Sequence, residues 1–337
     1  MRHVRASAAA SRIALVSVSA AVLAAGCHVP GTGGSGSATT GSGSITVAAV
    51  RGIDNAPLQL AVQQGLFRQH GLSVTIQPYT SVGQEIAALN SGHAQIAVGD
   101  YTDFFYAQYR GTAKLSLIAD GYDAVANSIA ILTLPTSGIT SPQQLQGLTV
   151  ASPPLGNIPS QHGLPYNMPT LAAEQVLQSD GLSPTSVSWR PTAAGSMITA
   201  LRSGRVKAIL VTEPYIFQAE AGLGAVEVVD SSNGVTGNLP LSGYFSLASY
   251  AKQQTANVQA FQAALSQAQS DASMGGGVQA VLPQYAGMSR QDAAMATVGT
   301  YPSTLSIGQV QRVLQLMVDS GMIANPSFTV SDMEFRP

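Results

Sequence analysis

One pattern of apolar and polar positions occurs twice in the chain. Residues 86–100 and residues 198–213 each contain the end of an amphipathic helix, a Ser-Gly pair, an apolar run and then a carboxylate. Glycine favours the left-handed conformation that ends a helix, and the apolar run is typical of a strand covered on both faces. The acids, Asp100 and Glu213, fall where each strand should end, which is where open α/β sheets bind ligands. Although helix–glycine–strand units occur in any α/β protein, the repeat predicts two similar lobes that face one cleft.

The first lobe is predicted from apolar runs that alternate between strand and helix periods. Strands are expected at residues 45–50, 72–76, 95–98 and 115–118. Helices are expected from Pro57, where a missing N–H costs nothing, and over residues 84–90 and 103–109. This regular alternation indicates a mostly parallel sheet with helices on both faces.

The second lobe is predicted from the same alternation further along the chain. Its strands are expected at residues 128–134, 148–151, 187–189 and 207–211, and its helices at residues 169–178 and 196–202. A return strand is expected at residues 238–249, followed by helices at 258–272, 290–298 and 307–320. We therefore expect lobe 1 to comprise residues 45–131 plus 242–337, and lobe 2 to comprise residues 132–241.

Composition narrows the function classes. The chain has 337 residues, of which 45% are hydrophobic and 9% are charged, so it can bury a large core. A formal net charge of −2 without a basic patch argues against nucleic acid as a partner. Because Cys27 is the only cysteine, an internal disulfide and a Cys-rich metal site are excluded. The sequence gives no reason to expect a metal or another cofactor.

The N-terminus is predicted to be an export signal. Three arginines precede a 13-residue apolar run, which is too short for an ordinary membrane span. The segment Leu23-Ala-Ala-Gly-Cys27 that follows resembles a bacterial lipobox, so we expect residues 1–26 to be a lipoprotein signal peptide and Cys27 to be lipidated. An ordinary signal peptide is the alternative. Residues 27–44 would then form a Gly/Ser-rich tether of roughly 20–25 Å between a membrane anchor and the folded domain, outside the cytoplasm.

Polar residues at the predicted strand ends are the candidates for ligand binding. Asp100 with Tyr101 is the favoured pair, because an aromatic ring beside a carboxylate can stack on a small ring and hydrogen-bond it. Asp54, Ser81 and Thr102 are equally well explained as helix caps. A long, proline-stiffened loop contributes Asn157. The candidates are Asp54, Asn55, Ser81, Asp100, Tyr101, Thr102, Tyr122, Asn157, Glu213 and Tyr215.

These segments resemble a known family, the solute-binding proteins of ABC importers with an SsuA/THI5-like domain. The resemblance is carried by Ala56-Pro57-Leu58, Gln64-Gly65-Leu66-Phe67, Gly71-Leu72-Ser73-Val74, Ala88-Leu89-Asn90-Ser91-Gly92, Gly138-Ile139, Leu145-Gln146-Gly147 and Glu213-Pro214-Tyr215. It covers about residues 45 to 265. It implies an α/β, type II periplasmic-binding-protein fold with two lobes, two hinge crossings and one ligand in the cleft. It also implies a permease and an ATPase as partners, and we expect the receptor to be a monomer.

The expected ligand follows from the acids at the predicted cleft edges. Buried carboxylates need donor partners, and the edges carry Asp54, Asp100, Asp123 and Glu213 against Arg51 and Arg190. This excess of acid favours a small nitrogen-containing solute, such as a thiamine-precursor-like pyrimidine. An oxyanion such as an alkanesulfonate, taurine or nitrate is the alternative, as is a sensor lipoprotein without transport. Catalysis is not expected, because the family's pyrimidine-forming branch uses an iron-binding Cys-rich motif that this sequence does not contain.

Overall fold

The structure is a computed structural model that describes residues 43–161, 163–183, 185–275 and 277–337. The proposed signal peptide, the lipidation site Cys27 and almost all of the tether lie outside the described residues. Within the described part of the chain, every helix is too short or too polar to cross a bilayer.

The first of two five-stranded sheets contains the N-terminal strands and the return strand. Its order is β2-β1-β3-β10-β4. The strands are β1 (Gly43–Val50), β2 (Leu72–Tyr79), β3 (Ile96–Asp100), β4 (Leu115–Asp123) and β10 (Pro240–Leu247). Strand β1 pairs in parallel with β2 and β3, whereas β10 runs antiparallel between β3 and β4. The expected mostly parallel sheet, with the return strand in it, is confirmed.

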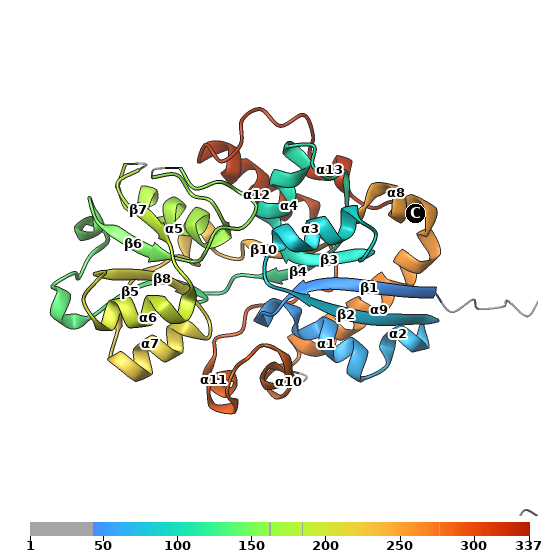
Figure 1. Ribbon diagram of the computed structural model, residues 1–337, viewed down its shortest axis with the longest axis horizontal. Helices are drawn as coiled ribbons and strands as arrows, with labels where there is room; N and C mark the ends of the chain where they lie inside the picture. Colours follow the sequence, from blue (N-terminus) through green and yellow to red (C-terminus); the bar gives the residue numbers. More distant parts are fainter. Residues whose placement is uncertain (1–42, 162, 184, 276) are drawn as a thin grey trace, which may run out of the picture. The chain divides into compact units, whose positions relative to one another are not determined.

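Helices cover both faces of this sheet, as expected (Figure 1). On one face lie α1 (Ala56–Gln63), α2 (Leu66–Gln69) and α9 (Thr255–Ser273), where the rings of Phe67 and Phe261 stack at 5.1 Å. On the other face lie α3 (Val82–Asn90), α4 (Tyr101–Tyr109) and α12 (Ile307–Asp319), where Phe104 stacks on Phe245 of β10 at 4.2 Å. The chain also forms α8 (Ala248–Gln253), α10 (Val278–Tyr285), α11 (Arg290–Met295) and α13 (Val330–Met333).

The second sheet is formed entirely from the middle of the chain. Its order is β7-β6-β8-β5-β9. The strands are β5 (Ile129–Thr133), β6 (Thr149–Ser152), β7 (Ser188–Pro191), β8 (Ala208–Thr212) and β9 (Val226–Asp230). Helix α5 (Met168–Ser179) covers one face, and α6 (Ala194–Arg202) and α7 (Tyr215–Leu223) cover the other (Figure 1).

The two sheets are joined by two crossings of the chain, one between β4 and β5 and one between β9 and β10. The second sheet starts at Ile129, slightly before the boundary that we expect after residue 131, and the return strand starts at Pro240. Strand β9 was not predicted. It is an edge strand whose Val226 is 41% exposed, so its apolar positions do not show the period of a buried strand.

Candidate functional site

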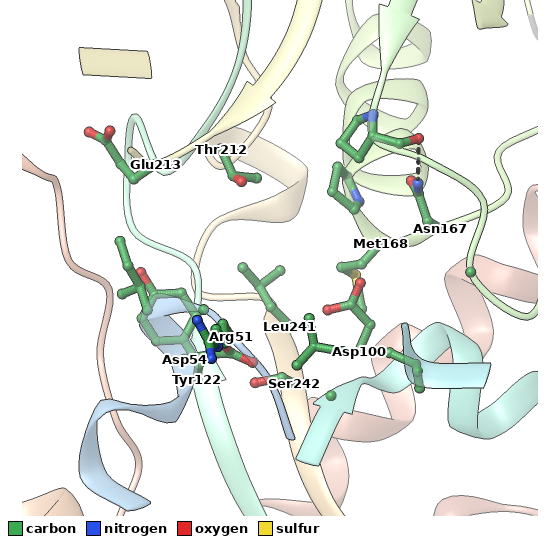
Figure 2. Close-up of a pocket in the computed structure, with 18 of the residues that line it drawn as sticks. Arg51, Asp54, Asp100, Tyr122, Asn167, Met168, Thr212, Glu213, Leu241 and Ser242 are labelled. Atoms are coloured by element: carbon green, nitrogen blue, oxygen red, sulfur yellow. Dashed lines mark hydrogen bonds between the residues drawn. The ribbon is translucent and has the colours of Figure 1, made fainter. Parts of the chain in front are cut away.

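A cavity of about 420 Å³ lies between the two sheets and is lined from both (Figure 2). From the first sheet come the ends of β1 and β3, together with Leu241 and Ser242 of the return strand. From the second come the end of β8, the loop at residues 153–156 and the start of α5. The cavity therefore lies at the strand ends that the sequence pattern indicates.

Three aspartates from the first sheet's side line this cavity. Asp54 lies in a short turn after β1, Asp100 ends β3, and Asp103 lies one helical turn later in α4. Burial raises the pKa of Asp54 and of Asp103 to about 6. Burial also raises the pKa of Asp100 well above its usual range, and the charges of Asp103 and Asp54 raise it further.

The hydrogen bonds of these acids differ. The Asp103 carboxylate accepts the backbone N–H of Asn157 from the facing loop. Glu213, on the second sheet's side, accepts the backbone N–H of Thr297 at 3.0 Å and that of Phe217 at 3.2 Å, and its carboxylate turns away from the centre of the cavity (Figure 2). Asp100 accepts no hydrogen bond from any described residue. It is the lining acid that the protein leaves without a donor.

A further carboxylate lies beneath the floor of the cavity. Glu85 of α3 is fully buried. One of its oxygens accepts the backbone N–H of Val50, and the other has no partner. Burial raises its pKa well above the usual range, and the nearby charges of Asp54 and Asp100 add to the shift. The floor thus adds a fifth acidic group to the four that line the cavity, and burial favours its protonated form.

Positive charge on the cavity is limited to one side chain among the described residues. Arg51 lines the cavity but is exposed to solvent, and Arg190 is exposed and away from it. The only ion pair in the described part of the chain joins Arg336 to Glu334, outside the cavity. The lining acids therefore have no ion-pair partner.

The rest of the lining combines apolar surface with fixed polar groups. Tyr122, Met168 and Leu241 offer apolar faces to a ring-sized solute. The Tyr122 hydroxyl accepts the backbone N–H of Gly299 at 2.6 Å, which fixes the ring. Asn167 donates to the carbonyls of Pro153 and Pro154 at 3.3 and 3.2 Å, which holds the facing loop in place (Figure 2).

Six of the predicted site residues line the cavity: Asp54, Ser81, Asp100, Tyr122, Glu213 and Tyr215. Their role in binding a ligand stays a prediction. Ser81 is also a helix cap, since its hydroxyl accepts the N–H of Gln84 at 3.4 Å in the first turn of α3.

Four of the predicted residues do not line the cavity. Tyr101 is fully buried in the first lobe, where its hydroxyl donates to Asp120 at 2.7 Å, so the expected Asp100–Tyr101 pair does not form. Thr102 is buried beside it and caps no helix. The helix beginning at Tyr101 turns both side chains away from the face that carries Asp100 and Asp103.

Asn55 and Asn157 serve the backbone instead of the cavity. Asn55 is buried, and its amide donates to the carbonyl of Val50, which closes the turn after β1. The Asn157 amide donates to the Asp103 carbonyl at 3.4 Å. Asp123, expected at the cleft edge, also lies off the cavity and pairs with Thr300 through its backbone.

Sequence reasoning missed several lining residues, of which Asp103, Asn167, Met168, Leu241 and Ser242 are the most informative. Asp103 had a usable signal, since residues three apart share one helix face. Ser242 had no such signal in the sequence, because only the sheet pairing brings β10 beside β3.

No group of acids, histidines or cysteines in the described residues is arranged to hold a metal ion.

Comparison with known proteins gives a family and a fold. The family model described as NMT1/THI5 like matches residues 53–274. A search of curated proteins finds no match to the sequence.

Solved structures with the same fold cover most of the chain at low identity. The alkanesulfonate-binding protein SsuA from Xanthomonas axonopodis pv. citri, bound to MOPS, is 18% identical with a TM-score of 0.68, over 87% of this chain and 98% of its own. The nitrate-binding protein NrtA from Synechocystis PCC 6803 is 14% identical with a TM-score of 0.66, over 86% and 84% of the two chains. The desulfurization enzyme DSZB is 15% identical with a TM-score of 0.64, over 87% and 96%. The expected periplasmic-binding-protein fold is confirmed.

Proposed function

The chain belongs to the NMT1/THI5-like family, and we propose that it is the extracytoplasmic solute-binding component of an ABC importer. The observation that carries this proposal is the cavity of about 420 Å³ at the strand ends of both sheets. Its volume suits a small solute, because small-molecule pockets in proteins have volumes of about 300–1,000 Å³. Its lining also fits, since such pockets combine apolar surface with a few convergent polar groups.

Capture works through closure of the two lobes on the solute. Two crossings connect the sheets, and short connections of this kind absorb the rotation in hinge-closing receptors. The lining from both sides means that closure surrounds the ligand with groups from each lobe. A permease then recognises the closed form, and its ATPase drives import.

The solute that we favour is small, polar and nitrogen-containing, and a thiamine-precursor-like pyrimidine is the leading candidate. Ring nitrogens and amino groups supply the donor that Asp100 lacks, and they add to the donors that Asp54 already has in Ser242 and the backbone. Tyr122, Met168 and Leu241 supply apolar contact for the ring. Alkanesulfonates, taurine and nitrate form the alternative ligand class. Two proteins with the same fold and low identity to this chain are an alkanesulfonate-binding protein and a nitrate-binding protein.

The proposal also covers location and activity. The signal peptide directs the protein out of the cytoplasm. Lipidation at Cys27 then anchors the receptor to the extracytoplasmic face of the membrane, and the tether joins this anchor to the folded domain. We propose binding without catalysis, and a sensor lipoprotein that keeps the fold without transport is the competing role.

Thermal unfolding of the purified protein against aminopyrimidines, alkanesulfonates, taurine, nitrate and amino acids tests the proposal. A ligand at a hundred times its dissociation constant adds about 2.7 kcal/mol, which raises the unfolding midpoint by roughly 5 °C in a domain of this size. A shift with aminopyrimidines alone supports the favoured solute, and a shift with sulfonates or nitrate alone supports the alternative. If no solute in the panel shifts the midpoint, the transport role loses its support and the sensor role gains it.

A further inference from the structure

The charge of the cavity is unbalanced. Asp54, Asp100 and Asp103 line it from one side, while Arg51 at its exposed rim forms no ion pair with them. Asp103 already has the backbone N–H of Asn157. Asp100 has no donor, although a desolvated carboxylate without one is unfavourable. The missing partner therefore has to come from outside the protein.

Ser242 is a second polar group that is left open toward the cavity. It is 1% exposed, it lines the cavity, and its hydroxyl lies toward the Asp54 carboxylate, whose pKa it lowers, without a close hydrogen bond to any described residue. Figure 2 shows the hydroxyl directed to the side of the cavity that holds Asp54 and Tyr122. Buried hydroxyls are nearly always paired in folded proteins. When the Ser242 hydroxyl donates toward Asp54, its lone pairs remain available to accept an N–H group of a ligand.

Three helix N-termini on the cavity, which otherwise favour anions, carry a side chain of the protein that accepts a backbone N–H. At the start of α3, the Ser81 hydroxyl accepts the N–H of Gln84 at 3.4 Å. At the start of α5, Asn167 accepts the N–H of Thr170 at 3.0 Å, and Pro169 has no N–H to offer. At the start of α7, the Glu213 carboxylate accepts the N–H of Phe217. An incoming oxyanion would find these donors occupied and would meet three aspartates.

From these observations we propose that the cavity binds its solute as an organic cation, with Asp100 as the counter-ion and Asp54 and Ser242 as further acceptors. Amidinium, guanidinium and ammonium groups have the required charge, and the first two present several N–H donors in one plane. The apolar surfaces of Met168 and Leu241 accommodate a small hydrocarbon or ring portion. This inference deepens the proposed receptor function and rests on it.

The first test compares probes that differ in charge. Benzamidine and agmatine are the cations, benzamide is the neutral counterpart of benzamidine, and benzenesulfonate is the anion. Calorimetry and thermal unfolding at pH 7.5 should detect binding of at least one cation and not of benzamide or benzenesulfonate. Equal or tighter binding of the sulfonate or the amide overturns the inference while leaving the receptor function intact. No binding by any probe overturns it as well, and solutes from the broader panel then decide whether the receptor function survives.

The second test needs no ligand. Asp100→Asn removes a desolvated carboxyl group that has no donor among the described residues, so the ligand-free variant should unfold roughly 2–4 °C higher than the wild type at pH 7.5. The same variant should lose at least about tenfold in affinity for the cation that binds. Asp319→Asn, at the exposed end of α12, is the matched control and should change neither quantity. An Asp100→Asn protein that is less stable than the wild type, or that binds the cation equally well, overturns the assignment.

Discussion

The Asp103 carboxylate in the first turn of α4 accepts the backbone N–H of Asn157, which lies in the loop between β6 and α5. The bond joins a helix packed on the first sheet to a loop that extends from the second. Asp103 is only 2% exposed, and the side-chain amide of Asn157 also donates to the Asp103 backbone carbonyl. This contact, with two donors from Asn157 and two acceptors on Asp103, is a point at which the two halves meet beside the cavity.

Removing that acceptor should loosen the contact between the halves. Asp103→Ala leaves the Asn157 N–H without its partner, so the ligand-free protein should sample more open arrangements. Small-angle X-ray scattering should then give a larger radius of gyration than for the wild type. Asp100→Asn, whose residue makes no such bond, serves as the control. An unchanged radius in Asp103→Ala would show that this bond does not hold the halves together.

The stability of the ligand-free protein should fall as the pH rises from about 4 to 7. Burial raises the pKa of Asp54, Asp103 and Asp120 to about 6 and that of Asp123 to about 7, against about 3.9 in an unfolded chain. Between these values the folded state holds more protons than the unfolded state, so raising the pH favours unfolding. Each group contributes at most about 1.4 kcal/mol per pH unit.

Urea titrations at pH 5 and pH 7.5 measure this effect. The free energy of unfolding should be larger at pH 5, and Asp54→Asn should reduce the difference between the two conditions. A protein that is more stable at pH 7.5 would contradict the burial of these carboxylates.

Tyr101→Phe should separate stability from binding. The change removes the 2.7 Å hydrogen bond to the Asp120 carboxylate, which among the described residues accepts one other, from the N–H of Gly121 at 3.1 Å. Urea denaturation should show a loss of about 1–2 kcal/mol. Because Tyr101 does not line the cavity, the variant should keep the wild-type response to every solute. A selective loss of binding would mean that Tyr101 belongs to the ligand site after all.

A methyl group at Gly243 should disturb the same part of the core. A Cβ at this position of β10 would lie 2.7 Å from the Tyr101 ring and hydroxyl, so Gly243→Ala should cost about 1–3 kcal/mol through overpacking. At Gly308 in α12, no described atom outside the neighbouring backbone of its own helix lies within 4 Å of an added Cβ. Gly308→Ala should therefore leave the protein as stable or slightly more stable, because alanine favours a helix. Equal urea midpoints for the two variants would refute the packing argument.

The architecture was predictable because its signals are local. Apolar runs ending in Ser-Gly or in a carboxylate mark strands and helix ends within a few residues, and these marks place β3 and β8 in corresponding positions. The rule that ligands bind at strand ends likewise predicted the positions of Asp100 and Glu213, which both line the cavity. Strand β9 was missed because an exposed edge strand has no apolar period to detect.

The site was only partly predictable because its remaining features depend on distant pairing. Tyr101 and Asp103 are neighbours in sequence, yet one is core and the other lines the cavity. Which face of α4 meets the sheet is decided by Phe245, more than a hundred residues later. The position of Ser242 beside Asp100 follows from the register of β10 against β3, which no local pattern records.

The place of β10 in the first sheet also sets an order of folding. Strand β4 reaches the rest of its sheet only through β10, whereas every strand of the second sheet lies between residues 129 and 230. A chain emerging from its N-terminus therefore holds an incomplete first sheet until residue 247 is available, whereas all strands of the second sheet are present once residue 230 is available. Since pairing between distant segments is slow, we expect the half that contributes the three cavity aspartates to become native last, and the solute site to be completed with it.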